Sequence, residues 1–92
     1  MPRVSIRSNF AAKSKKVDSV SLREEAASLM GCLQEVEAAM KVKLVNRELS
    51  DVYPDIEVTL NEVDSAFLPD RLATRVKDGD TVGISVITMG GG

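Results

Sequence analysis

Two kinds of hydrophobic spacing occur along this chain, and together they limit its fold more than any other feature. Apolar residues recur every three or four positions between Leu22 and Met40, which predicts an amphipathic helix. Before and after that segment, apolar and polar residues alternate with a period of two, at residues 3–9, 56–60 and 82–86, which predicts half-buried strands. A helix and several strands within 92 residues indicate a single α+β domain with one modest core.

The helix is expected to begin at Ser21. Ser21 and Glu24 have the spacing of a capping box, in which the hydroxyl and the carboxylate each accept a hydrogen bond from a free backbone amide. Gly31 is expected to weaken the middle of the helix by about 1 kcal/mol relative to alanine. The apolar stripe that faces the core is predicted to contain Leu22, Ala26, Leu29, Leu33, Val36 and Met40.

The remaining segments are shorter. Residues 10–16 are predicted to form a loop, and residues 17–20 a short returning strand. Residues 42–45 either extend the helix or form a strand, and residues 62–68 form a crossing loop or a short strand. Apolar residues at Leu72 and Val76 alternate with polar ones toward the Asp-Gly turn at residues 77–80. In the strand that follows the turn, the side chains expected to face inward are those of Val82, Ile84 and Val86.

The chain has few residues suited to catalysis. It contains no histidine, which removes the usual general base and the commonest metal ligand. Cys32 lies within the predicted helix beside apolar neighbours, and is therefore interpreted as a buried structural thiol. Asp78 and Asp80 are interpreted as turn formers and not as a metal-binding or acid pair. No metal and no bound cofactor are expected, and the reactive group must lie elsewhere.

Charge and hydropathy narrow the expected partners and location. The formal net charge is −2 and the isoelectric point is about 5.1, which argues against nucleic acid as the main partner. The small basic cluster of Lys13, Lys15 and Lys16 is interpreted as a solvated loop. No apolar run approaches the roughly eighteen residues of a membrane helix, and no signal segment is recognisable. With one cysteine no intramolecular disulfide can form, so a cytoplasmic location is expected.

Three glycines, Gly90, Gly91 and Gly92, follow the last predicted strand closely. One explanation is an inert, flexible chain end. The other is access: a terminus that enters a narrow enzyme channel cannot carry side chains, and glycine lets the backbone approach closely. Activation of the terminal carboxylate by ATP gives an acyl-adenylate, which then accepts sulfur to form a thiocarboxylate or an amine to form an isopeptide.

Two stretches resemble a known family when taken together with the closing glycines. They are residues 55–63, with the sequence DIEVTLNEV, and residues 77–82, with the sequence KDGDTV. The chain resembles the ubiquitin-like sulfur carriers, and in length it is most similar to the small subunit of molybdopterin synthase. The resemblance implies a ubiquitin-like β-grasp fold, with a mixed sheet packed on one main helix and the terminal strand in the middle of the sheet. Residues 1–89 would form this domain, and residues 90–92 a flexible C-terminal glycine tail.

The resemblance also implies a carrier that is not itself an enzyme. Gly90 and Gly91 match the Gly-Gly of the family, so the reactive carboxylate is either that of Gly92 or that of Gly91 after trimming. An adenylating enzyme related to ubiquitin-activating enzymes would consume the ATP. The tail would then enter a larger catalytic subunit of the molybdopterin synthase type.

The surface beside the tail is expected to take part in docking. If Val86 faces inward, then Ile87 and Met89 face outward next to the tail and offer an apolar patch. Alternatively, the strand is covered on both faces. Two further functions also remain open, namely a protein modifier that forms isopeptide bonds with lysines and an interaction domain with an inert tail. The second strand of the family is expected to be shortened in this chain. Val86 and Ile87 replace prolines that often precede the tail in the family. These differences leave the identity of the partner open.

Overall fold

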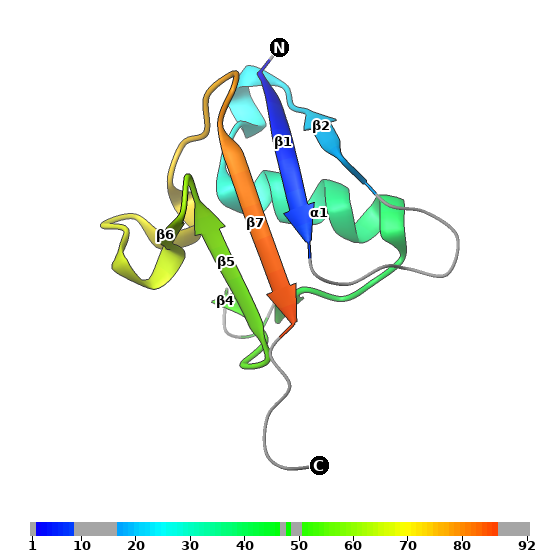
Figure 1. Ribbon diagram of the computed structural model, residues 1–92, viewed down its shortest axis with the longest axis vertical. Helices are drawn as coiled ribbons and strands as arrows, with labels where there is room; N and C mark the ends of the chain where they lie inside the picture. Colours follow the sequence, from blue (N-terminus) through cyan, green and yellow to red (C-terminus); the bar gives the residue numbers. More distant parts are fainter. Residues whose placement is uncertain (1, 9–16, 47, 49–50, 87–92) are drawn as a thin grey trace.

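Residues 2–8, 17–46, 48 and 51–86 are described by the computed structural model of the chain. They form a mixed sheet with a helix lying across one of its faces (Figure 1). The residues of the predicted tail, residues 90–92, lie outside the described ranges, as do Ile87 and Met89.

The three longest strands form the middle of the sheet. β1 (Arg3–Ser8) lies beside β7 (Thr81–Val86), which lies beside β5 (Ile56–Leu60). The short strands β2 (Ser19–Ser21) and β6 (Val63–Asp64) complete the order β2-β1-β7-β5-β6. β1 and β7 are parallel, and the other neighbours are antiparallel. The strand nearest the C-terminus is therefore central, as the β-grasp expectation required.

The main helix, α1 (Leu29–Met40), begins eight residues later than the sequence predicted. Ser28 is its N-cap, and the Ser28 hydroxyl accepts a hydrogen bond of 3.1 Å from the backbone N–H of Gly31. Gly31 therefore lies in the first turn, where an added Cβ would be 2.2 Å from the carbonyl oxygen of Ala26. No helix within the described ranges is long and apolar enough to span a membrane.

The predicted capping box at Ser21 was wrong because strand pairing takes up that residue. Ser21 ends β2, where it is paired with Arg3 of β1. The next residues form only the short 3₁₀ helix η1 (Glu24–Ala26). Ala26 is consequently exposed, and its neighbour Ala27 takes the core position.

The core lies between α1 and the face of the sheet that α1 covers. The helix contributes four of the six predicted side chains together with the thiol of the cysteine, while Leu22 is buried outside the helix and Ala26 is exposed. The members from α1 are Leu29, Cys32, Leu33, Val36 and Met40. The members from the three central strands are Val4, Ile6, Ile56, Val58, Leu60, Val82 and Ile84. Alternate residues of each strand are buried, which confirms the period-two interpretation of these segments.

Residues 42–45 do not extend the helix, and only Val45 among them belongs to a strand, since residues 42–44 have no regular structure. Lys41 ends α1 in the left-handed conformation, with a φ of 55°. The Glu37 carboxylate then accepts hydrogen bonds from the backbone N–H groups of Leu44 and Val45, at 2.7 and 3.1 Å. These bonds hold the chain against the helix before β3 (Val45–Asn46), which pairs with β4 (Asp51–Val52) in a separate two-stranded ribbon.

The alternation at Leu72, Thr74 and Val76 does not form a strand. The segment after β6 contains two 3₁₀ helices, η2 (Ser65–Phe67) and η3 (Arg71–Ala73). Leu72 and Val76 are nevertheless buried, because the chain runs beside the start of α1. There the N–H of Leu29 donates to the carbonyl of Thr74 at 3.0 Å.

Candidate functional site

β7 is the element that leads to the predicted site. It is flanked by β1 on one side and by β5 on the other, and it runs the full length of the sheet (Figure 1). The predicted site residues follow β7 in sequence, so β7 is the described strand nearest to them along the chain. The assignments of Gly90, Gly91 and Gly92, and of Ile87 and Met89 as docking residues, remain predictions because these residues lie outside the described ranges.

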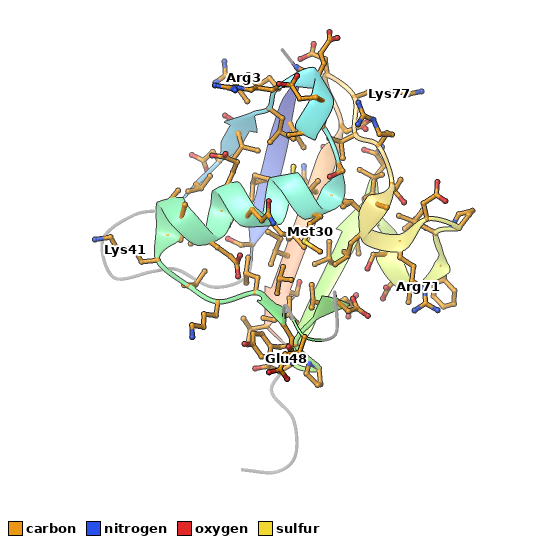
Figure 2. All side chains as sticks on the ribbon, turned by 180° about the vertical axis from the view of Figure 1, so that it is seen from behind. Arg3, Met30, Lys41, Glu48, Arg71 and Lys77 are labelled. Atoms are coloured by element: carbon orange, nitrogen blue, oxygen red, sulfur yellow. The ribbon has the colours of Figure 1, made fainter. Side chains whose placement is uncertain are left out.

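The turn before β7 fastens its first end to β1. Gly79 has a φ of +91°, which glycine adopts without strain. Its N–H donates to the carbonyl of Arg3 at 3.0 Å, and the Asp78 carboxylate accepts from the N–H of Arg3 at 2.8 Å. In Figure 2, Arg3 and Lys77 lie at this same end of the molecule. The Asp-Gly turn is thus confirmed, and it joins η3 to β7 instead of joining two hairpin strands.

Asp80 and Asn61 connect the same end of β7 to the turn between β5 and β6. One carboxylate oxygen of Asp80 accepts from the N–H of Lys77 at 2.8 Å, and the other accepts from the Asn61 amide at 3.2 Å. The amide oxygen of Asn61 accepts from the N–H of Thr81 at 3.0 Å. The carboxylates of Asp78 and Asp80 are therefore engaged in shaping the turn, as their interpretation as turn formers predicted.

The middle of β7 is fixed by packing on both of its faces. Val82 and Ile84 are fully buried under α1. On the opposite face, a Cβ at Gly83 would lie 2.5 Å from the Oγ1 atom of Thr59. Glycine therefore allows the threonine side chain of β5 to lean across β7.

The far end of β7 is more open than the sequence predicted. Val86 was expected to face the core, but 37% of its surface is exposed, whereas Val82 and Ile84 are completely buried. Val86 pairs with Ile56 at the start of β5, beyond the last register pair between β1 and β7, which joins Ser8 to Ile84. The chain thus reaches the edge of the core one strand position earlier than expected.

A groove of about 960 Å³ opens between the C-terminal half of α1 and the ribbon of β3 and β4. Glu48, one of its lining residues, lies at the end of the molecule opposite to Arg3 and Lys77 (Figure 2). The other lining residues are Gln34, Glu37, Ala38, Val42, Lys43, Val45, Asn46 and Tyr53. The groove is lined by side chains of both charges, by amides and by one phenol. Among them, the Glu37 carboxylate already accepts hydrogen bonds from the backbone.

Cys32, the one cysteine of the chain, is not activated as a nucleophile. Burial raises the pKa of the Cys32 thiol to about 12, and the negative charges of Asp80 and Glu35 add to this effect. The thiol is therefore protonated at neutral pH and is a poor nucleophile. Within the described ranges, no three potential ligand side chains are grouped so as to hold a metal ion.

Sequence reasoning missed several residues that position β7. Asn61 follows an alternating strand and was read only as its polar end, and Gly83 was read only as a polar-side position. Glu37 was not singled out at all. Asn61 has a φ of 49°, a conformation that asparagine tolerates better than most residues, so an asparagine directly after a strand was the available signal. Nothing in the sequence indicated that Glu37 accepts two backbone hydrogen bonds.

Comparison with known proteins identifies the fold through structure and not through sequence. No protein-family model matches the chain, and no curated protein matches it. Among solved structures, the solution structure of the Haloferax volcanii HVO 2177 protein is similar, with a TM-score of 0.75 and 22% identity. That match covers 98% of this chain and 87% of the other.

Two further structures match over nearly their whole length. A chain in the crystal structure of the Amycolatopsis orientalis BexX/CysO complex is 29% identical, with a TM-score of 0.68, and the match covers 99% of this chain and 100% of that one. The H. volcanii small archaeal modifier protein 1 is 14% identical, with a TM-score of 0.70, and the match covers 96% and 100% of the two chains. The order of the strands, the single main helix and these matches agree, and the chain has the β-grasp fold of small ubiquitin-like proteins.

Proposed function

We propose that this protein is a sulfur carrier whose working group is the carboxylate of its C-terminal glycine. The observation that carries the proposal is the arrangement of β7, which is anchored at one end, central in the sheet and followed in sequence by three glycines. The described residues offer no activated thiol and no metal site as an alternative. A carrier of this kind requires none, because its partners supply the catalysis.

The proposed cycle has three steps. The carboxylate of Gly92, or of Gly91 after trimming, attacks the α-phosphate of ATP, which forms an acyl-adenylate and releases pyrophosphate. Sulfide then attacks the acyl carbon, displaces AMP and leaves a thiocarboxylate. The thiocarboxylate transfers its sulfur to an acceptor, and water restores the carboxylate. ATP is bound by the activating enzyme in this scheme, and the carrier holds no cofactor.

Two partners follow from the proposal. The first is an adenylating enzyme related to ubiquitin-activating enzymes. The second is a larger catalytic subunit of the molybdopterin synthase type, which makes the synthesis of molybdenum or tungsten cofactor the favoured pathway. One structure to which this chain is similar, the BexX/CysO complex, holds two proteins together, which supports a role in association with a partner.

Pyrophosphate exchange with tail variants tests the proposal. In the presence of the adenylating enzyme, the full chain should support ATP–pyrophosphate exchange. Deletion of Gly92 alone distinguishes the two possible reactive carboxylates, because exchange then persists only if the carboxylate of Gly91 can be adenylated. Deletion of Gly91 and Gly92 together should abolish exchange. Undiminished exchange by that double deletion would contradict the proposal.

A protein modifier is the second candidate, and the similarity to small archaeal modifier protein 1 favours it. The activation step is the same, but the acyl group is transferred to a lysine amine and forms an isopeptide bond. Conjugates of high mass in cell extract, absent for the double deletion, would identify a modifier. If neither sulfur transfer nor conjugates depend on the glycines, the chain is an interaction domain with an inert tail.

A further inference from the structure

The face of the sheet opposite α1, called the outer face below, is polar and faces the viewer in Figure 1. It is formed by the residues that alternate with the buried ones on the central strands. These residues are Arg3, Ser5 and Arg7 of β1, Thr81, Gly83 and Ser85 of β7, and Glu57 and Thr59 of β5. Its centre lies along β7, where the side chains are small or missing.

Charge is separated across the outer face. Arg3 and Arg7 lie on β1, whereas carboxylates lie on the other side of β7, on β5 and β6 and in the turn between them. These carboxylates are Glu57, Glu62 and Asp64. The strand register places four residues in one row across the sheet, from a cation at one side to a carboxylate at the other. The row is Arg7, Gly83, Thr59 and Asp64.

The charges nearest β7 are not used within the described part of the fold. Arg3 donates to the hydroxyl of Ser19, but the side chains of Arg7 and Glu62 are exposed and form no hydrogen bond or ion pair with any described residue. Both line a recess of about 310 Å³ in the outer face. Gly83 contributes no side chain to this recess, so another surface can approach the sheet closely along β7.

This pattern is complementary to itself under one particular symmetry. A half-turn about an axis that lies between two outer faces and runs parallel to β7 places β1 of one copy over β5 and β6 of the other. The positive side of each copy then meets the negative side of the other. A half-turn about an axis perpendicular to the strands would instead place Arg7 against Arg7. Two-fold interfaces require such self-complementary patches.

We propose that the outer face is a homodimer interface, in which Arg7 of each copy pairs with Glu62 of the second copy. Glu62 lies two residues before Asp64, which belongs to the row of Arg7. The two long side chains can bridge this separation. The outer face has no large apolar side chain on its central strands, so the dimer is weak and its stability falls as salt is added.

The symmetry has a consequence for the end of β7. An axis parallel to the strands brings the C-terminal ends of the two β7 strands to the same end of the dimer. If the proposed function holds, both carrier termini are then presented together. The dimer itself does not depend on the proposed function, because none of the residues that form it belongs to the tail.

Sedimentation velocity over micromolar to low-millimolar concentrations tests the interface. At low ionic strength the full chain should show a concentration-dependent dimer. Arg7→Glu and Glu62→Arg should each weaken it by at least about tenfold, because like charges then face each other twice. An equimolar mixture of the two single variants should recover the dimer, since each mixed dimer contains one native pair and one reversed pair.

Lys43→Glu is the matched control, because it makes the same change of charge in the groove beside α1 and not on the outer face. It should leave the dimer unchanged, and circular dichroism should show that all variants are folded. The proposal is overturned if the chain is monomeric throughout the range, if Arg7→Glu has no effect, or if mixing the variants restores nothing. Sedimentation of the double glycine deletion should match that of the full chain, so a failed carrier function would leave this test intact.

Discussion

The two ends of β7 differ in how they are held. At the first end, Asp78 and Gly79 bond to the backbone of Arg3, and Asp80 and Asn61 tie the strand to the turn after β5. At the other end, Val86 pairs with β5 beyond the last register pair with β1, and more than a third of its surface is exposed. Hydrogen bonds fix the first end of the strand, whereas the other end lies at the boundary of the core.

This difference separates the residues that keep the protein folded from those proposed to act. A terminus that is proposed to enter a narrow channel in a partner cannot carry side chains. The strand that leads to it must therefore be held in place by residues elsewhere in the fold. The turn at residues 77–80 supplies that support on the opposite side of the molecule. Changes at the first end should therefore alter the free energy of unfolding, while changes near the last end should alter it little.

The largest effect should come from comparing two valines on the same strand. Val82→Ala removes fully buried methyl groups and should lower the free energy of unfolding by about 2–3 kcal/mol. Val86→Ala removes the same atoms from the partly exposed end and should cost less than about 1 kcal/mol. Urea denaturation at unchanged m value measures both. Equal losses at the two positions would refute the proposed contrast.

The anchoring turn should contribute the next largest effect. Asp80→Ala leaves the N–H of Lys77 and the Asn61 amide without their acceptor and should cost about 1–2 kcal/mol. Asp70→Ala is the matched control, because its side chain does not cap the helix it precedes. Its effect should be within about 0.5 kcal/mol of zero. If thermal or urea unfolding shows no difference between these two variants, the turn does not anchor β7.

A smaller effect is expected at the close approach between β7 and β5. Gly83→Ala places a methyl group 2.5 Å from Oγ1 of Thr59, so the threonine must rotate and the variant should lose about 1 kcal/mol. Thr59→Ala removes the obstructing atom. In a double-mutant cycle, the alanine at position 83 should be tolerated better in the Thr59→Ala background. Strict additivity of the two changes would mean that the contact does not constrain the strand.

The smallest effect on the free energy of unfolding at neutral pH is expected from the ionisation of the Cys32 thiol. Because its pKa is raised to about 12, native protein should resist alkylation that unfolded protein undergoes readily. The folded state favours the neutral thiol, so this contribution to stability is complete below the ordinary pKa of 9.0 and declines as pH rises from 9 toward 12. Asp80→Asn should lower the thiol pKa slightly by removing one negative charge. Rapid native alkylation at pH 7 would contradict this assignment.

Much of the fold followed from hydrophobic spacing. The alternation at residues 3–9 and 56–60 located β1 and β5, and alternation also identified the strand before the glycines. The central position of that strand was implied only by the resemblance to the ubiquitin-like sulfur carriers. The start of the helix was placed wrongly because Ser21 has a capping signature but pairs with Arg3 in the sheet. Local spacing cannot reveal a competing strand partner eighteen positions away in the chain. The true N-cap, Ser28, lacks the glutamate or glutamine three residues later that would have marked it.

The predicted site residues lie outside the described ranges and stay a prediction, and the contacts that support β7 could not be predicted from spacing. The absence of histidine and the apolar neighbours of Cys32 argued against a conventional active site, and the burial of Cys32 is confirmed. The exposure of Val86 was missed because alternation gives the direction of a side chain and not the point at which the core ends. The roles of Asn61 and Glu37 depend on contacts with the backbone of distant residues, which residue spacing does not encode.

The central claim is that the reactive group is the C-terminal carboxylate, and mass spectrometry tests it most directly. The full chain would be incubated with ATP, a sulfur donor and the adenylating enzyme, and its intact mass measured before fragmentation. Our account predicts the replacement of one oxygen by sulfur, located by fragmentation on Gly92, or on Gly91 if the tail is trimmed. An unchanged mass, with an enzyme shown to be active on another carrier, would contradict it.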